Sequence, residues 1–433
     1  MQIFLKNFLF FFEKICFNNK LCLRGVISKE TIFFSGVIMK VFFCKLYILG
    51  IFCLGFALPG YSQYEAWNKL LGVPFFNANY QWQRQEFEQT MRRSCRLFFR
   101  GSNELRTAVP RFAILDSTAY EIRANYDKAG NLTVIDIIFA NKGDNVEDRR
   151  IRKVIRNTAR LLEKKISALG GMPKRSDYGH KKMQNDAKKW NVDNKAEIVL
   201  EYASNEFAAL HICFATQSGS GGKQNKETAA SETDILNNVS STIFGDVYIK
   251  NIPMVNQGNK GYCVPATVER VLRYYGISNI NMHQLADAGN TNRGGGTSSR
   301  AMFSGISSAC RKSGLKMAST GEVRMKMVKK YIDRGVPIFW CMFSNPEYEE
   351  LRARSKQLRQ QAESPQAWAK KNKKIKISSG GNGHMCLIIG YNELTEEIAV
   401  SNSWGDHEIS PSWVPLRVAV RVSQGSTVVL MPR

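Results

Sequence analysis

The sequence has no two cysteines separated by two residues, although it contains ten cysteines. Without that spacing, the common zinc-binding pattern and the common dithiol redox motif are both missing, and we expect no metal and no cofactor. Motifs for reading DNA or RNA are missing as well. The sequence therefore argues against a zinc protein, a dithiol oxidoreductase and a specific nucleic-acid binder.

Acidic residues are scarce: 37 Asp and Glu face 61 Lys and Arg, for a formal charge of +24. Such a charge favours contact with an anionic surface or polymer, or with an acidic substrate. The basic residues are scattered among acidic ones over most of the chain, as on an ordinary solvated surface. An anionic surface or polymer stays open as a partner, and no specific nucleic acid is expected.

Residues 1–62 have the composition of a targeting segment. Leu46–Leu58 is an apolar run of thirteen residues, too short to span a bilayer but suited to the core of a signal peptide. Small residues at Gly60 and Ser62 allow cleavage before Gln63, so we expect export to the periplasm, the cell surface or the medium. We expect Met39 to be the true start of the protein. The alternative is an uncleaved amino-terminal membrane anchor.

Residues 64–216 read as a small α+β domain of unknown function. Alternating apolar and polar residues at 120–126 and 132–139 predict a hairpin, helical spacing predicts a helix at 150–169, and 197–202 with 207–215 predict a second strand pair. His211 lies in the last of these strands beside Cys213, and we expect both in the core rather than on a metal. Residues 217–244 are predicted to be a flexible linker, because 217–234 are rich in Gly, Ser and charge.

Cys263 stands where a helix is predicted to begin in the second domain, residues 245–433. Apolar residues continue at helical spacing to Tyr275, Gly276 ends the pattern, and Pro265 suits a first helical turn. A helix amino terminus favours a thiolate, the reactive form of cysteine. Gln257 lies six residues earlier in a glycine-containing loop, where its amide can serve as an oxyanion donor.

His384 leads a predicted buried strand that runs to Tyr391. A turn reverses the chain, and the returning strand brings Asn402 back to the level of His384. An amide oxygen can then hold one imidazole nitrogen while the other faces the thiol. Trp404 is placed to cover that hydrogen bond. His283 and His407 are the other histidines of this domain that could serve as a base.

These residues, in the order Gln257, Cys263, His384, Asn402, resemble papain-like cysteine peptidases, and the short domain is similar to the C39-like branch. The resemblance begins at Gly245 and implies an α+β fold in which an amino-terminal helix carries the cysteine and an antiparallel sheet carries the histidine and asparagine. It implies hydrolysis of peptide or protein substrates by Cys263 with His384 as base, Gln257 in the oxyanion hole and Asn402 orienting the ring. All four groups follow the linker, so this domain is expected to act without the first.

Two departures keep other functions open. Val264 follows the cysteine where C39-like sequences often have Gly, and Asn402 stands where they often have Asp. The domain is therefore a peptidase, an acyltransferase of the same fold, or an inactive binding or adhesion module. Substrate, cleavage specificity and oligomeric state are not indicated by the sequence. A basic insertion at 347–380 is expected to be a solvated helix and loop whose position could flank the cleft.

Overall fold

A computed structural model describes residues 62–94, 98–100, 104–107, 113–127, 129–142, 150–180, 183–215, 230–258, 261–277, 280–292, 296–405 and 410–433. The predicted targeting segment lies outside the described residues, apart from Ser62. Within the described part of the chain, no helix is both long and apolar enough to cross a membrane.

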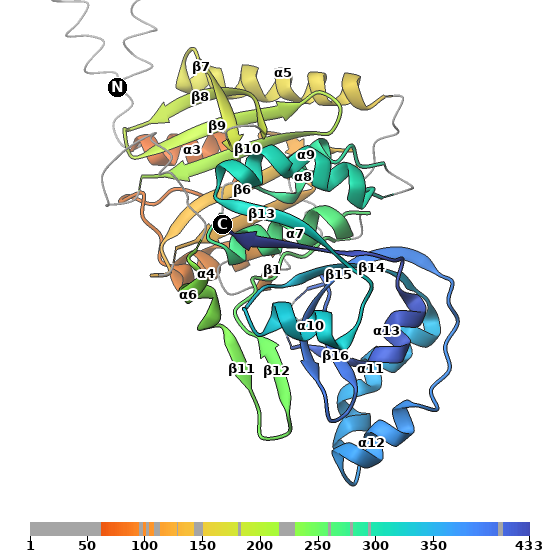
Figure 1. The fold of residues 1–433 in the computed structure, drawn as a ribbon. Coiled ribbons are helices and arrows are strands. Elements are labelled where there is room, and N and C mark those ends of the chain that lie inside the picture. Colours follow the sequence, from red (N-terminus) through yellow and green to blue (C-terminus); the bar gives the residue numbers. More distant parts are fainter. Residues whose placement is uncertain are drawn as a thin grey trace, which may run out of the picture. The chain divides into compact units, whose positions relative to one another are not determined.

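The first half of the described chain forms an eight-stranded antiparallel sheet, which we call the first sheet (Figure 1). Its strand order is β1-β2-β5-β6-β10-β9-β8-β7. The strands are β1 (Phe98–Arg100), β2 (Glu104–Thr107), β5 (Glu121–Tyr126), β6 (Leu132–Asn141), β7 (Lys174–His180), β8 (Met183–Val192), β9 (Ala196–Ala203) and β10 (Phe207–Phe214). A separate pair is formed by β3 (Ala113–Ile114) and β4 (Ser117–Thr118).

One long helix, α5 (Ile151–Gly170), packs on the first sheet through an apolar stripe that includes Ile155, Leu162 and Ile166. Two shorter helices, α3 (Gln63–Leu71) and α4 (Arg84–Ser94), add Trp67 and Phe87 to the same core. The predicted hairpin, helix and second strand pair correspond to β5–β6, α5 and β9–β10. The β7–β8 hairpin was not predicted, because its residues are mostly polar.

The second half of the described chain builds another antiparallel sheet, the second sheet, in the order β11-β12-β15-β14-β18-β13, with β16 on β15 and β17 on β16. Its strands are β11 (Val239–Ser241), β12 (Asp246–Ile249), β13 (Leu315–Gly321), β14 (Ile338–Ser344), β15 (Asn382–Asn392), β16 (Glu397–Ser401), β17 (Ser412–Pro415) and β18 (Thr427–Pro432). The helices are α7 (Cys263–Tyr274), α8 (Met282–Ala288), α9 (Ser299–Lys312), α10 (Met325–Ile332), α11 (Pro346–Gln360), α12 (Pro365–Asn372) and α13 (Leu416–Val422). This mixture of helix and sheet is the α+β class that the sequence predicts.

The predicted linker is ordered in its second half. Helix α6 (Glu232–Leu236) begins at a capping box between Ser231 and Asp234, and β11 pairs with β12. Ile235 is buried in the core of the second sheet, and its carbonyl packs closely against Gly335. The prediction of a flexible linker over all of 217–244 is therefore wrong for 231–241, because one buried side chain attaches that segment to the core.

The insertion at 347–380 contains α11 and α12, and it is more firmly attached than a solvated helix and loop would be. Tyr348 and Trp368 are almost fully buried. The Arg359 guanidinium lies 4.3 Å from the ring centre of Trp413 and forms an ion pair with Asp246. The insertion therefore packs against the second sheet at both of its helices.

Candidate active site

The cysteine predicted to be the nucleophile is the first residue of α7. Pro265 lies in the first turn, where its missing N–H costs no hydrogen bond, and no side chain caps the helix start. Past Tyr274 the chain leaves the helix through Gly276, whose φ of +82° is easily adopted only by glycine. The first backbone N–H groups of α7 are therefore placed beside the thiol.

Surrounding protein controls the ionisation of this thiol. Burial raises the pKa of Cys263, and hydrogen bonds from the backbone N–H groups of Met385, Val264 and Cys263 itself oppose that effect without reversing it. The sequence predicted a thiolate from the helix terminus alone, and it did not account for burial. Burial therefore favours the neutral thiol over the thiolate, and a base beside the sulfur would help to form the nucleophile.

Asn402 holds the imidazole of His384. The Nε2 atom of His384 lies 2.9 Å from Oδ1 of Asn402, and both residues are buried. Since an amide oxygen only accepts, Nε2 carries the proton and Nδ1 is the basic nitrogen. The ring of Trp404 covers this pair, with its centre 4.8 Å from that of His384.

Contacts made by Met385, the residue after His384, join the histidine strand to α7. Its N–H group points to the sulfur of Cys263, and its carbonyl accepts a hydrogen bond of 3.2 Å from the Thr267 hydroxyl. The first turn of α7 therefore lies against β15 at the level of His384. This arrangement brings the predicted nucleophile and the predicted base to the same place.

Gln257 is attached to the segment that carries Asn402. Its backbone N–H donates to the carbonyl of Ser403 at 2.8 Å, and the Ser403 hydroxyl donates to Oε1 of Gln257 at 2.8 Å. With Oε1 accepting from Ser403, the amide nitrogen of Gln257 is directed away from that contact. All four residues predicted from the sequence therefore gather where the start of α7 meets the strands β15 and β16.

Sequence reasoning missed two further residues that support this site. Ser403 fixes the amide of Gln257, as described above. Arg270, two turns along α7 from the cysteine, donates to the Asn402 carbonyl at 2.7 Å and to the Ser401 hydroxyl at 2.7 Å. The only signal in the sequence was an arginine on the apolar face of a helix. A single side chain thus connects the cysteine helix to the chain that carries Asn402.

The insertion also reaches this site. The guanidinium of Arg352, on α11, lies 5.1 Å from the ring centre of Trp404. Arg352 donates to the Glu349 carboxylate at 2.8 Å and to the Ser412 hydroxyl at 3.2 Å. An arginine stacked on an aromatic face is an attractive and orienting contact. The insertion therefore contributes the outer layer over the tryptophan that covers His384.

Residues 249–416 match the model of the Peptidase_C39 like family. This part of the chain is a C39-like domain. Two solved structures are similar to the chain: a C39-like protein from Bacillus anthracis, at 14% identity and a TM-score of 0.29, and xylellain, a cysteine protease from Xylella fastidiosa, at 12% identity and a TM-score of 0.25. The first comparison covers 43% of this chain and 98% of the Bacillus anthracis protein. The second covers 49% of this chain and 94% of xylellain. No curated protein matches the chain.

The C39-like match contains Gln257, Cys263, His384 and Asn402, and it leaves the first sheet outside. Of the two other candidate bases, His283 lies on α8 and contacts Asn141 of the first sheet, whereas His407 lies outside the described residues. His384 is thus the described histidine of the C39-like domain whose neighbour in sequence, Met385, contacts Cys263.

Proposed function

We propose that the protein is an exported cysteine peptidase with Cys263 as nucleophile and His384 as base. The observation that carries the proposal is the pair of contacts around β15. The Nε2 atom of His384 is held by Asn402 at 2.9 Å, and the next backbone N–H points to the sulfur of Cys263. Nucleophile, base and orienting group then stand in the order that covalent catalysis needs.

In the proposed reaction, His384 Nδ1 takes the proton of the Cys263 thiol as the sulfur attacks a peptide carbonyl carbon. The Gln257 amide nitrogen and a backbone N–H at the start of α7 stabilise the oxyanion. The carbon–nitrogen bond then breaks, and His384 returns its proton to the leaving amine. Water, deprotonated by His384, attacks the resulting thioester and releases the acid and the thiol. Because burial raises the pKa of the thiol, the attack depends on His384 as the acceptor of its proton.

The same residues allow two other outcomes. An acyltransferase would pass the acyl group from the thioester to an amine instead of water. An inactive binding or adhesion module would keep the cleft without turnover, and Val264 at the position after the cysteine is the feature that favours it. In either case the positive charge of the chain is suited to an anionic surface or polymer.

The experiment is to incubate purified residues 63–433 with a peptide library and added amines, and to identify the products by mass. Peptidase activity gives hydrolysed fragments, and acyl transfer gives amine adducts. Cys263→Ala and His384→Ala should abolish turnover, because the two residues act as one unit. Cys310→Ala, at another free cysteine of the domain, is the matched control and should keep it.

A folded protein without either product, or turnover that survives Cys263→Ala, would overturn the proposed catalysis. Export is tested separately by determining the amino terminus of the protein produced in cells. A mature chain beginning at Gln63 is expected. A chain that keeps its amino-terminal segment would favour the membrane anchor instead.

A further inference from the structure

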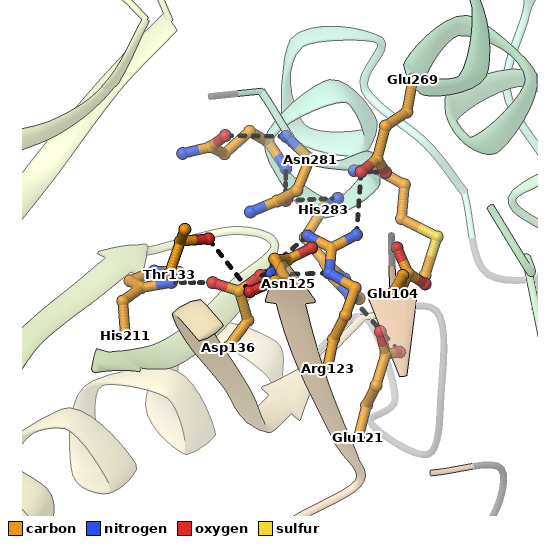
Figure 2. Close-up of polar contacts among 12 residues, drawn as sticks. Glu104, Glu121, Arg123, Asn125, Thr133, Asp136, His211, Glu269, Asn281 and His283 are labelled. Carbon is orange, nitrogen blue, oxygen red and sulfur yellow. Dashed lines mark hydrogen bonds and ion pairs between the residues drawn. The ribbon is translucent and has the colours of Figure 1, made fainter. Parts of the chain in front are cut away.

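Charged and polar side chains are buried where the first sheet meets α7 and α8 (Figure 2). Such groups are costly to bury unless each finds a partner. Here the partners on the two sides come from segments 56 to 169 residues apart in the chain. The contacts therefore belong to a built interface, and they surround the helix that begins at Cys263.

The first anchor of this helix is Tyr262, the residue immediately before the proposed nucleophile. Its side chain is fully buried. Its hydroxyl lies 2.7 Å from Oδ1 of Asn141, at the end of β6, and 2.6 Å from Oε1 of Glu206, in the turn before β10. The amide nitrogen of Asn141 lies 2.7 Å from Nδ1 of His283. The start of α7 is therefore fixed to the first sheet through the Tyr262 hydroxyl, which donates its one proton to this pair of oxygens.

The second anchor lies nearly two turns further along α7. Glu269 is fully buried and contacts Nη1 of Arg123, from β5, at 2.8 Å, and Nη2 of Arg273 at 2.6 Å. Its other oxygen accepts the Met282 backbone N–H at 2.6 Å, at the start of α8. Arg273 continues to Glu104 of β2 at 2.7 Å. Figure 2 shows Arg123 between the strands of the first sheet and Glu269.

Helix α8 is held by a third contact, which closes the network. Gln284 donates to Oε1 of Glu201, on β9, at 2.9 Å. Without the first sheet, Tyr262, Glu269 and Gln284 would lose partners that satisfy them in the buried interface. Since a buried polar group that loses its partner destabilises its surroundings, the orientation of α7 depends on the first sheet.

We propose that the first sheet is a positioning part of the peptidase, and that Tyr262 is the positioning residue through which it sets the orientation of the Cys263 thiol. This replaces the expectation from the sequence that residues 245–433 act alone. The proposal rests on the proposed function for its effect on turnover. Its effect on the reactivity of the thiol is independent of turnover.

The test compares Tyr262→Phe with Tyr275→Phe in the full mature protein. Both tyrosines are fully buried, and each variant removes one hydroxyl. The hydroxyl of Tyr275 donates to the Leu430 carbonyl at 2.6 Å, which is in the second sheet. Tyr262→Phe should lower kcat by about 10- to 100-fold with KM within about twofold, because small displacements of a reacting group cost that much. Tyr275→Phe should leave both constants within about twofold.

A second measurement follows alkylation of Cys263 by iodoacetamide, with the site identified by mass mapping. Tyr262→Phe should change the rate at Cys263 and its pH profile, while the rates at Cys310 and Cys386 stay constant. Glu206→Gln keeps an oxygen that accepts from Tyr262, and it should stay close to the original protein in both measurements. Equal melting temperatures for the two tyrosine variants would exclude a general loss of folding.

The proposal is overturned if Tyr262→Phe matches Tyr275→Phe in kcat and in the alkylation of Cys263. It is also overturned if Tyr262→Phe changes only the melting temperature. If the original protein has no turnover but Tyr262→Phe still alters the alkylation of Cys263, the peptidase assignment fails and the positioning role stands. The two failures are thus distinguishable.

Discussion

Raising the pH from 6.5 to 9 should weaken the folded protein, because a buried histidine in the first sheet then loses its proton. His211 is fully buried between two carboxylates, with Nδ1 2.7 Å from Asp136 and Nε2 2.8 Å from Glu201. Burial by itself lowers the pKa of His211, but the hydrogen bonds and charges of these carboxylates outweigh it and raise the pKa to about 9. His211 is therefore an imidazolium in the folded protein at neutral pH.

The sign and size of the effect follow from linkage. Below about pH 6.5 the histidine is protonated in both states, and its stabilising contribution is complete. Between 6.5 and 9 the unfolded chain has lost the proton that the folded protein still holds, so the free energy of unfolding falls as the pH rises. At about 1.4 kcal/mol per pKa unit, a shift of this size is worth about 3 kcal/mol, which is lost by pH 9.

The carboxylates that hold His211 also belong to the interface with α7 and α8. Asp136 accepts from Arg123 at 3.0 Å, and Glu201 accepts from Gln284 at 2.9 Å. Burial raises the pKa of Asp136, but Arg123 and His211 lower it overall, so its own contribution is present above its ordinary pKa of 3.8 and is lost on acidification. Deprotonation of His211 should therefore loosen contacts on both sides of the interface.

The assay is urea unfolding followed by tryptophan fluorescence at several pH values from 6 to 9.5. The original protein should lose stability across this range, and His211→Gln, which cannot titrate, should lose much less. Equal slopes for the two proteins would refute the reasoning. If His211→Gln does not fold, an NMR titration of His211 in the original protein decides the question, since a pKa near 6.5 would contradict the charged bridge.

Two further predictions concern the candidate active site. Gln257→Ala is expected to lower kcat by about 10²–10³-fold with little change in KM, because one of at least two oxyanion donors is lost. If steady-state kinetics show an unchanged kcat, Gln257 is not part of the oxyanion hole. Asn402→Ala is expected to keep more activity than His384→Ala, because the ring loses its orienting hydrogen bond of 2.9 Å and keeps its basic nitrogen. Equal losses in two folded variants, measured in the same assay, would mean that Asn402 does more than orient the ring.

Local patterns in the sequence were enough to predict the elements that carry the candidate site. Helical spacing after Cys263, a buried strand after His384 and a short turn before Asn402 each reflect a period that secondary structure imposes on apolar residues. Antiparallel pairing of β15 with β16 then follows from the turn between them. For this reason the proximity of His384 and Asn402 could be predicted from the sequence.

Contacts between residues distant in sequence could not be predicted in the same way. Glu201 shares a face of β9 with Glu197, which usually indicates a solvated face, and Asp136 is a single acidic residue among apolar ones in β6. The structure buries both, because His211 and Arg123 lie opposite them. Periodicity tells which residues share a face of a strand, but not what covers that face. The polar attachment of α7 to the first sheet was missed for the same reason.

Burial also changes the meaning of the net charge. Among the described residues, eight carboxylates are buried but only three lysine or arginine side chains; the carboxylates are Glu88, Glu104, Glu121, Asp136, Glu201, Glu206, Glu269 and Glu397. Among the described residues, acidic side chains are thus buried more often than basic ones, although acidic residues are the rarer kind in the sequence. The rest of the chain therefore carries a larger positive excess than +24 indicates. Since solvent-facing charge governs encounters with other molecules, this asymmetry supports the proposal of an anionic surface or polymer as a partner.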